Sequence, residues 1–190
     1  QVKARKILGW PENKKIVLFF GLVRKYKGLD LLITAFSKPP LNKSDVVLAI
    51  VGEAYESEKK YTEMIESLAL KDRVLLDFNY ATTEKARLVF SAADLVAQTY
   101  RNATQSGVTP LAYHFQVPLL VSDIPGLKTP VLEDSTGEIC EIDPLKIAER
   151  LSFMFSGDVL TQCKSAFLKV KNKYHWKTFG KSLMAFINQI

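Results

Sequence analysis

Residues 103–123, ATQSGVTPLAYHFQVPLLVSD, contain the succession that decides the fold: a small polar loop, a segment of helical character and a short apolar strand that follows Pro118. Loop, helix and strand in this order are typical of the crossover in an α/β protein. Thr104, Ser106 and Gly107 stand where the helix begins, and the free backbone N–H groups of a helix start attract anions. Serine and threonine also cap helices that bind nothing, so this stretch alone leaves both interpretations open.

The rest of the chain repeats the alternation of strand and helix. Apolar strands are predicted at residues 16–20, 46–51, 74–78, 94–98, 118–122 and 137–142, and helices at 1–9, 29–36, 55–70, 83–93, 108–117, 144–156 and 158–173. Residues 124–136 carry turn signals and are expected to form a turn followed by an irregular segment. Strands that are apolar at nearly every position are typical of parallel sheets covered on both faces. The sequence therefore predicts an α/β fold: a Rossmann-like, doubly wound, mostly parallel six-stranded sheet with helices on both faces.

Composition narrows the class of protein. The chain has 190 residues, of which 47% are hydrophobic, and this suits a single domain with a packed core. Its apolar runs are far shorter than the ~20 residues that cross a bilayer. The formal net charge of +6 would suit an acidic ligand or an anionic membrane surface, although solvated lysines explain most of it. The chain opens with QVKARK and no methionine, so we expect it to be part of a longer protein.

Polar residues gather where the predicted strands end, which is where doubly wound sheets bind ligands. Arg24 and Lys27 follow the first strand, and a guanidinium and an ammonium are both suited to holding phosphate. Gly21 in the same loop would let the backbone come close to a ligand. The other candidate binding residues at strand ends are Gly52, Asn79, Tyr80, Thr104, Gln105, Ser106 and Gly107.

Several familiar sites are missing from the sequence. There is no Gly-x-Gly-x-x-Gly after the first strand, no phosphate-binding P-loop and no serine nucleophile elbow. No group of His, Cys and Asp has the spacing of a metal site, so we expect neither a metal nor a bound cofactor. A site with anion-binding groups but few residues for acid–base catalysis indicates the half of an enzyme that binds a substrate, with the catalytic chemistry carried out elsewhere.

The residues match one family over nearly the whole chain. The match rests on four segments: FFGLVRKYKGLDLLITAF (19–36), VVLAIVGEAYES (46–57), LKDRVLLDFNYATTEKARLVFSAADLVAQTY (70–100) and VPLLVSDIPGLKTPVLEDSTGEICE (117–141). Together they resemble the C-terminal, sugar-nucleotide-binding domain of group 1 glycosyltransferases with the GT-B fold. The loop from Gly21 to Gly28, the phrase SAADL and the segment PLLVSDIPGL are the most specific parts of the resemblance.

The resemblance implies a metal-independent, retaining transfer of a sugar from a nucleotide-sugar donor, such as a UDP- or GDP-sugar, to a hydroxyl acceptor. Arg24 and Lys27 would then hold the diphosphate and stabilise the leaving nucleotide. The other candidates would divide between the nucleobase (Gly52, Asn79 and Tyr80) and the phosphates and sugar (Thr104, Gln105, Ser106 and Gly107). The acceptor, a glycan or lipid-linked saccharide, would bind another domain.

Two departures from the family pattern concern the donor site. Many relatives have a basic residue directly after the first glycine, whereas here that position is Leu22. The family often carries two glutamates eight positions apart, the second of which grips the ribose, and those positions fall at Ala103 and Leu111. We expect Thr104, Gln105 and Ser106 to supply part of that function by hydrogen bonding.

The resemblance also places the chain within a larger protein. The acceptor domain would precede Gln1, and residues 175–190 resemble the helix that crosses back to it, with Trp176, Phe179, Leu183 and Phe186 on one face. A bacterial, cytoplasmic enzyme is expected, with a charge suited to the inner membrane surface and with no nucleic-acid partner. A sugar-nucleotide epimerase and a non-catalytic nucleotide-binding module remain alternatives, whereas the missing glycine fingerprint disfavours an NAD-dependent oxidoreductase.

Overall fold

Six strands form a single sheet in the computed structural model, which describes residues 1–170, 173–174 and 176–188. The strands are β1 (Lys15–Phe20), β2 (Val46–Val51), β3 (Val74–Asp77), β4 (Leu95–Gln98), β5 (Leu119–Ser122) and β6 (Gly137–Cys140). Their order across the sheet is β3-β2-β1-β4-β5-β6, and each neighbouring pair is parallel. The predicted doubly wound sheet is therefore confirmed.

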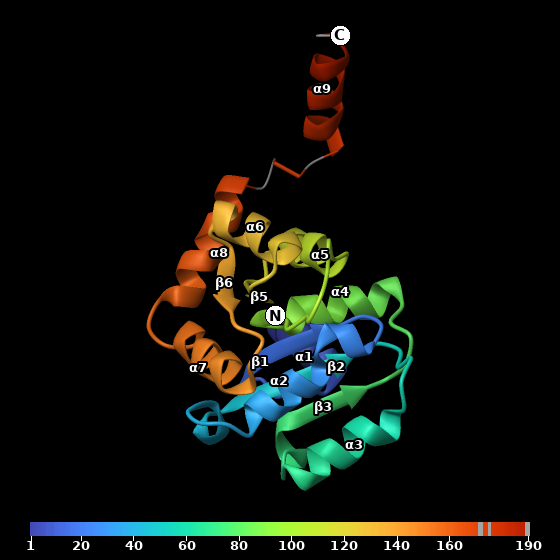
Figure 1. The fold of residues 1–190 in the computed structure, drawn as a ribbon, viewed down its shortest axis with the longest axis vertical. Helices are drawn as coiled ribbons and strands as arrows, with labels where there is room; N and C mark the ends of the chain where they lie inside the picture. The colour runs from blue at the N-terminus through green and yellow to red at the C-terminus, as the bar shows by residue number, and fades with distance from the viewer. Residues whose placement is uncertain (171–172, 175, 189–190) are drawn as a thin grey trace.

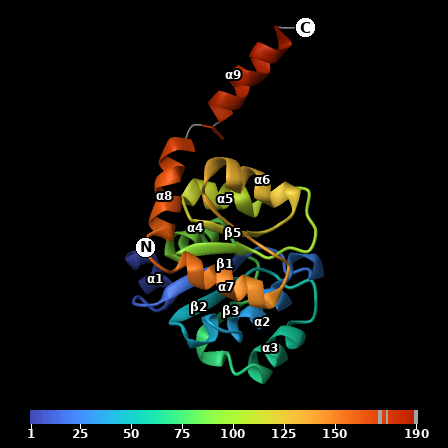
Figure 2. The ribbon, with the colours of Figure 1, turned by 60° about the vertical axis from the view of Figure 1, so that its left-hand side comes forward.

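Helices cover both faces of this sheet (Figures 1 and 2). The helices α2 (Leu29–Phe36), α3 (Glu58–Ser67) and α7 (Pro144–Met154) pack on one face, and α1 (Val2–Leu8), α4 (Thr83–Ala92), α5 (Val108–Phe115) and α6 (Pro125–Asp134) on the other. The helix α8 (Val159–Val170) contacts both α6 and α7. Short 3₁₀ turns occupy Lys25–Lys27, Leu41–Lys43 and Lys71–Arg73.

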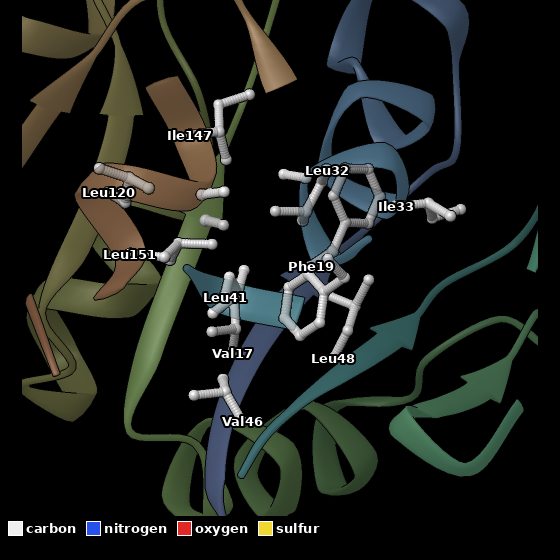
Figure 3. Packing of buried hydrophobic residues seen from close by; sticks show 14 of the residues in the cluster. Val17, Phe19, Leu32, Ile33, Leu41, Val46, Leu48, Leu120, Ile147 and Leu151 are labelled. Atoms are coloured by element: carbon white, nitrogen blue, oxygen red, sulfur yellow. The ribbon is translucent and has the colours of Figure 1, made fainter. Parts of the chain in front are cut away.

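Alternate residues of the central strands fill two hydrophobic cores. Val17 and Phe19 of β1 face the core beneath α2 and α7, which Figure 3 shows in close view, whereas Ile16 and Leu18 face the core beneath α4 and α5. All four side chains are almost completely buried. A strand packed on both sides needs apolar residues at every position, and this explains the unbroken run in the sequence.

The structure corrects the expected irregular segment at residues 124–136. Residues 125–134 form the helix α6, which begins with Pro125 in the first turn, where the missing N–H of proline costs no hydrogen bond. Pro130 lies inside this helix and weakens its sequence signal. Leu127 and Val131, one helical turn apart, are fully buried and hold the helix against the sheet.

The expected helix at residues 55–70 is shorter than predicted. The backbone of Val23 pairs with that of Ala54, and Tyr55 N donates to Val23 O at 3.1 Å, so these residues continue the sheet pairing instead of entering the helix. The helix begins after Ser57 and ends before Ala69, whose φ of 54° is left-handed. Three residues at each end of the prediction were therefore wrong.

The C-terminal helix α9 (Trp176–Ile187) confirms the helix predicted near residues 175–190, although residues 175, 189 and 190 lie outside the described part of the chain. Both ribbon views show α9 standing clear of the sheet and its covering helices (Figures 1 and 2). Its Leu183 and Phe186 side chains are 45% and 61% exposed. Among the described residues, none of the helices has the length and apolar character that crossing a membrane requires.

Candidate functional site

The strand order reverses between β1 and β4, which are neighbours in the sheet although β2 and β3 separate them in sequence. Their C-terminal loops, residues 21–28 and 99–107, therefore meet at the point where doubly wound sheets bind ligands. Hydrogen bonds join the two loops: Thr99 Oγ1 donates to Gly28 O at 3.1 Å, and Arg101 N donates to Tyr26 O at 2.6 Å. The switch point is thus a rigid junction of two loops.

Lys27 occupies the centre of this junction. It closes the 3₁₀ turn Lys25–Lys27, is only 8% exposed, and places Nζ 5.6 Å from the ring centre of Tyr100. Within the described part of the chain, no carboxylate or other hydrogen-bond acceptor pairs with this ammonium. Burial, together with the charge of Arg24, lowers the pKa of Lys27 to about 8. Such an ammonium would gain from any anion that reached it.

Gly21 makes room for that ammonium. A β-carbon at this position would lie 3.1 Å from Lys27 Nζ and 3.8 Å from Cγ2 of Val108, the first residue of α5. The φ of Gly21 is 95°, a value that side chains rarely allow. Lys27 Nζ and the start of α5 therefore both lie close to the end of β1.

Gly52 lies directly beside Gly21. A β-carbon on Gly52 would stand 2.3 Å from Gly21 O, and Gly52 N donates to Asp77 O at 2.9 Å. Gly21 N in turn donates to Val51 O at 2.9 Å. These hydrogen bonds join the C-terminal ends of β1, β2 and β3. Gly52 therefore lies at the edge of the sheet, beside the switch point.

Arg24 differs from Lys27 in being exposed, with its guanidinium carbon 4.7 Å from the ring centre of Tyr55. Stacking of this kind orients the side chain but leaves its N–H donors available. Another cation near these loops, Arg101, is already neutralised, because its two terminal nitrogens donate to both carboxylate oxygens of Asp30 at 2.7 and 2.6 Å. Arg24, Lys25 and Lys27 have no ion pair among the described residues; Arg24 and Lys27 lie over aromatic rings, whereas Lys25 is exposed in the 3₁₀ turn.

The hydroxyl of Ser106 fastens the loop that leads into α5. Its Oγ accepts hydrogen bonds from Gln98 Nε2 at 2.8 Å and from Val108 N at 3.2 Å, and it lies 3.3 Å from the hydroxyl of Tyr100. Gln98 is fully buried and also accepts from Thr109 Oγ1 at 3.0 Å. The protein thus uses Ser106 internally, to fix the start of α5.

The neighbours of Ser106 face outward. Thr104, Gln105 and Gly107 are exposed, and Gly107 has an ordinary φ of −65° with nothing within 4 Å of the position of a β-carbon. They form an open rim over the first turn of α5. Hydroxyl, amide and backbone groups at such a rim can bind a ligand without first breaking a bond to the protein.

Asn79 and Tyr80 lie farther from the switch point. They follow β3, which β2 and β1 separate from β4. Asn79 Nδ2 donates to Asp77 Oδ1 at 2.9 Å, and Asn79 also lines a cavity of about 600 Å³ with Trp10 and Lys85. Tyr80 is 73% exposed. Asn79 and Tyr80 therefore lie apart from Lys27, at the end of the sheet that β3 forms. A ligand that contacted all three residues would have to span this distance.

Gln98, Tyr100 and Tyr55 shape the site but were missed as candidates from the sequence. The signal for Gln98 was present, because an amide inside a strand whose four residues are all buried must find hydrogen-bond partners. Tyr100 and Tyr55 have no comparable sequence signal, since their roles depend on which loops meet. The residues described include no cluster of three or more His, Cys, Asp or Glu that could hold a metal ion.

Comparisons with known proteins agree with this arrangement. The family model described as "Glycosyl transferases group 1" matches residues 1–165. A D-inositol 3-phosphate glycosyltransferase of Xylanimonas cellulosilytica is 29% identical over 157 residues, which cover 81% of this chain and 37% of that protein. The chain thus spans well under half the length of this relative.

Two solved structures share the fold. HepE of Anabaena in complex with UDP has a TM-score of 0.82 at 22% identity, over 99% of this chain and 52% of that one. The C-terminal domain of the group 1 glycosyl transferase LpcC from Francisella tularensis has a TM-score of 0.78 at 18% identity, over 92% and 93% of the two chains. Since the family model covers most of the sequence and the fold agrees, this chain belongs to the group 1 glycosyltransferases.

Proposed function

We propose that this chain is the donor-binding half of a metal-independent, retaining glycosyltransferase that uses a nucleotide-diphosphate sugar. The observation that carries the proposal is Lys27, a buried ammonium without an anionic partner among the described residues, held beside the start of α5. The diphosphate of a donor would supply two negative groups to Lys27, to Arg24 and to the exposed rim of Thr104, Gln105 and Gly107 before α5. Family membership and the UDP complex of HepE support this choice of ligand.

The chemistry of such a site is electrostatic. As the bond between sugar and diphosphate breaks, negative charge grows on the leaving phosphate, and fixed cations stabilise that charge more than they stabilise the intact donor. Arg24 and Lys27 are placed for this function. The acceptor and the groups that position it would come from another domain, so we expect the 190-residue chain to bind donor without transferring sugar.

One observation favours a second candidate, a nucleotide-binding module without catalysis. Ala103 and Leu111 occupy the positions at which the family often has its paired glutamates. Leu111 packs against the core and offers no polar group to a ribose. A module of this kind would bind the same diphosphate, and only turnover by the longer protein separates the two candidates.

Binding is tested by thermal unfolding of the 190-residue chain with UDP-, GDP- and ADP-sugars and with NAD. A nucleotide at 100 times its Kd would stabilise the chain by about 2.7 kcal/mol, which is a measurable rise in Tm. We expect one nucleotide class to raise Tm, and Lys27→Met or Arg24→Ala to abolish the rise. Lys25→Met is the matched control, because Lys25 is exposed in the same turn. The proposal fails if no nucleotide sugar changes Tm at millimolar concentration.

A further inference from the structure

Among the described residues of the switch point, Tyr100 is, like Lys27, a buried polar group whose hydrogen bonding is incomplete. We propose that its hydroxyl is a binding group of the site, which donates a hydrogen bond to the diphosphate of the donor. This inference rests on the proposed function, because it names a further contact in the same site. Three independent features of the structure support it: the direction of the hydrogen bonds around Ser106, the position of the phenol, and its burial.

The direction of the hydrogen bonds follows from counting lone pairs on Ser106. A hydroxyl oxygen has two acceptor sites and one hydrogen. Gln98 Nε2 and Val108 N, at 2.8 and 3.2 Å, already fill both acceptor sites of Ser106 Oγ. The contact of 3.3 Å between Ser106 Oγ and the Tyr100 oxygen must therefore use the hydrogen of Ser106, with Tyr100 as the acceptor.

The phenolic hydrogen of Tyr100 is left over by this arrangement. Ser106 and Gln98 are the hydrogen-bond partners of that hydroxyl among the described residues. Ser106 acts as the donor, and the hydrogen bond with Gln98 lowers the pKa of Tyr100, as a donor does. Tyr100 as a residue is only 2% exposed, and a buried hydroxyl that does not donate its hydrogen lowers stability until an acceptor reaches it. An acceptor supplied by a ligand would remove that loss of stability.

The position of Tyr100 tells us which ligand group would reach it. The ring lies beside Lys27 Nζ, and the hydroxyl lies beside Ser106 at the first turn of α5. Lys27 Nζ and Val108, where α5 begins, both lie close to Gly21. The phenol therefore belongs to the same junction as the buried ammonium and the start of the helix, where an anion would bind.

Burial keeps the phenol in the form that can donate. It raises the pKa of Tyr100, and the hydroxyl stays protonated at neutral pH. The ring is held edge-on against Tyr26, with 5.9 Å between the ring centres, so little freedom remains to be lost on binding. The Tyr100 hydroxyl is a neutral hydrogen-bond donor held in one position, so it would fix the orientation of a phosphate that the cations attract.

The test measures how inorganic pyrophosphate and UDP bind to the 190-residue chain by calorimetry. Tyr100→Phe removes the hydroxyl and keeps the ring. We expect it to weaken both ligands by about tenfold or more, as for loss of a hydrogen bond to a charged group. Tyr26→Phe is the matched control, because it removes an exposed hydroxyl from the ring that touches Tyr100, and it should bind both ligands like the wild type.

A second readout separates a direct contact from a role in holding the loop. A phenol that donates to a negative charge absorbs at longer wavelength, so ligand binding should produce a near-ultraviolet tyrosine difference band. This band should persist in the double variant Tyr26→Phe/Tyr55→Phe and vanish in Tyr100→Phe. If Tyr100→Phe does not fold, the double variant still decides the matter, because loss of the band there would overturn the assignment.

The outcomes distinguish this inference from the proposed function. If Lys27→Met loses pyrophosphate and UDP but Tyr100→Phe binds both within twofold of the wild type, the donor site stands and the assignment of Tyr100 is overturned. If the wild-type chain binds neither pyrophosphate nor UDP, both are overturned. A tenfold loss in Tyr100→Phe together with loss of its band supports the assignment.

Discussion

Lys27 is the residue of its loop on which the proposed anion binding depends most, and its lowered pKa limits the pH range in which it carries a charge. Its burial and the nearby charge of Arg24 lower its pKa to about 8, from an ordinary value of 10.5. The charged form is therefore less stable in the folded protein than in the unfolded chain. An anion reverses this balance, because it stabilises the ammonium in the folded state alone.

The pH dependence of binding follows from that pKa. We expect the affinity for pyrophosphate to fall by about tenfold between pH 7 and pH 9, as Lys27 loses its proton. Without ligand the trend is opposite: between pH 8 and 10.5 the unfolded chain binds more protons than the folded one, so Lys27 makes stability rise with pH. Calorimetry across this range checks both trends. A wild-type affinity that stayed constant from pH 7 to pH 9 would contradict the prediction.

Gly21 and Gly107 allow a paired prediction, because both lie at the site but only Gly21 is constrained. Gly21→Ala places a side chain at a φ of 95° and 3.1 Å from Lys27 Nζ, so it should cost roughly 1–3 kcal/mol of stability and displace the ammonium. Gly107→Ala, at a φ of −65° in open space, should leave stability unchanged or raise it by less than about 1 kcal/mol. Urea unfolding measures both changes, and an equal loss in the two variants would refute the argument.

At the level of helices and strands, the sequence predicted what periodicity controls and missed what contacts between distant segments control. The buried strands were read correctly, because residues such as Val17 and Ile16 serve opposite cores. The helix α6 was missed because Pro125, Gly126 and Pro130 read as a turn. Gly126 is needed for packing: a β-carbon there would lie 2.0 Å from Thr104 O, in the loop before α5. The sequence analysis interpreted Gly126 as a turn residue, whereas the fold needs a glycine there because α6 and the loop before α5 are in close contact.

Asp134, at the end of α6, ties the C-terminal segment to the domain. Its buried carboxylate accepts hydrogen bonds from Tyr113 at 3.0 Å, Tyr174 at 2.7 Å and Lys173 at 2.7 Å. Burial raises the pKa of Asp134, but these three donors outweigh burial and hold the pKa below its ordinary value. The charged carboxylate therefore stabilises the fold, and this contribution is lost as the pH falls through the acid range.

Asp134→Asn should accordingly lower the free energy of unfolding by about 2 kcal/mol at pH 7, the scale of a hydrogen bond to a charged group. The difference from the wild type should shrink below about pH 4, where the wild-type carboxylate itself becomes protonated. Glu133→Gln is the control on the same helix, because Glu133 is exposed and pairs with Lys173 at 3.3 Å. It should cost less than about 1 kcal/mol. Urea unfolding at pH 7 and pH 3 tests the pair, and equal costs would count against the role of Asp134.

The whole molecule explains which part of the candidate site could be predicted from the sequence. Ligands of a doubly wound sheet bind at its switch point, and the structure places the loops after β1 and β4 there. The contacts between those two loops could not be predicted from the sequence. Only in the folded chain does Arg101 pair with Asp30, and only there does Ser106 turn toward Gln98 and Tyr100. Arg24, Lys25 and Lys27 are then the cations of these loops without an ion pair among the described residues.

The same view of the whole molecule sets α9 apart from the site. Leu183 and Phe186 are exposed on a helix that stands clear of the domain, far along the chain from the loops around Lys27. Leu183→Glu/Phe186→Glu should therefore leave pyrophosphate binding within twofold of the wild type, while it lowers self-association of the chain, because exposed apolar side chains promote contact between copies. Lys181→Glu on the same helix is the control and should retain the wild-type self-association. Calorimetry and sedimentation measure the two properties. A loss of binding in the double variant would mean that α9 reaches the proposed site, although both ribbon views show it clear of the domain.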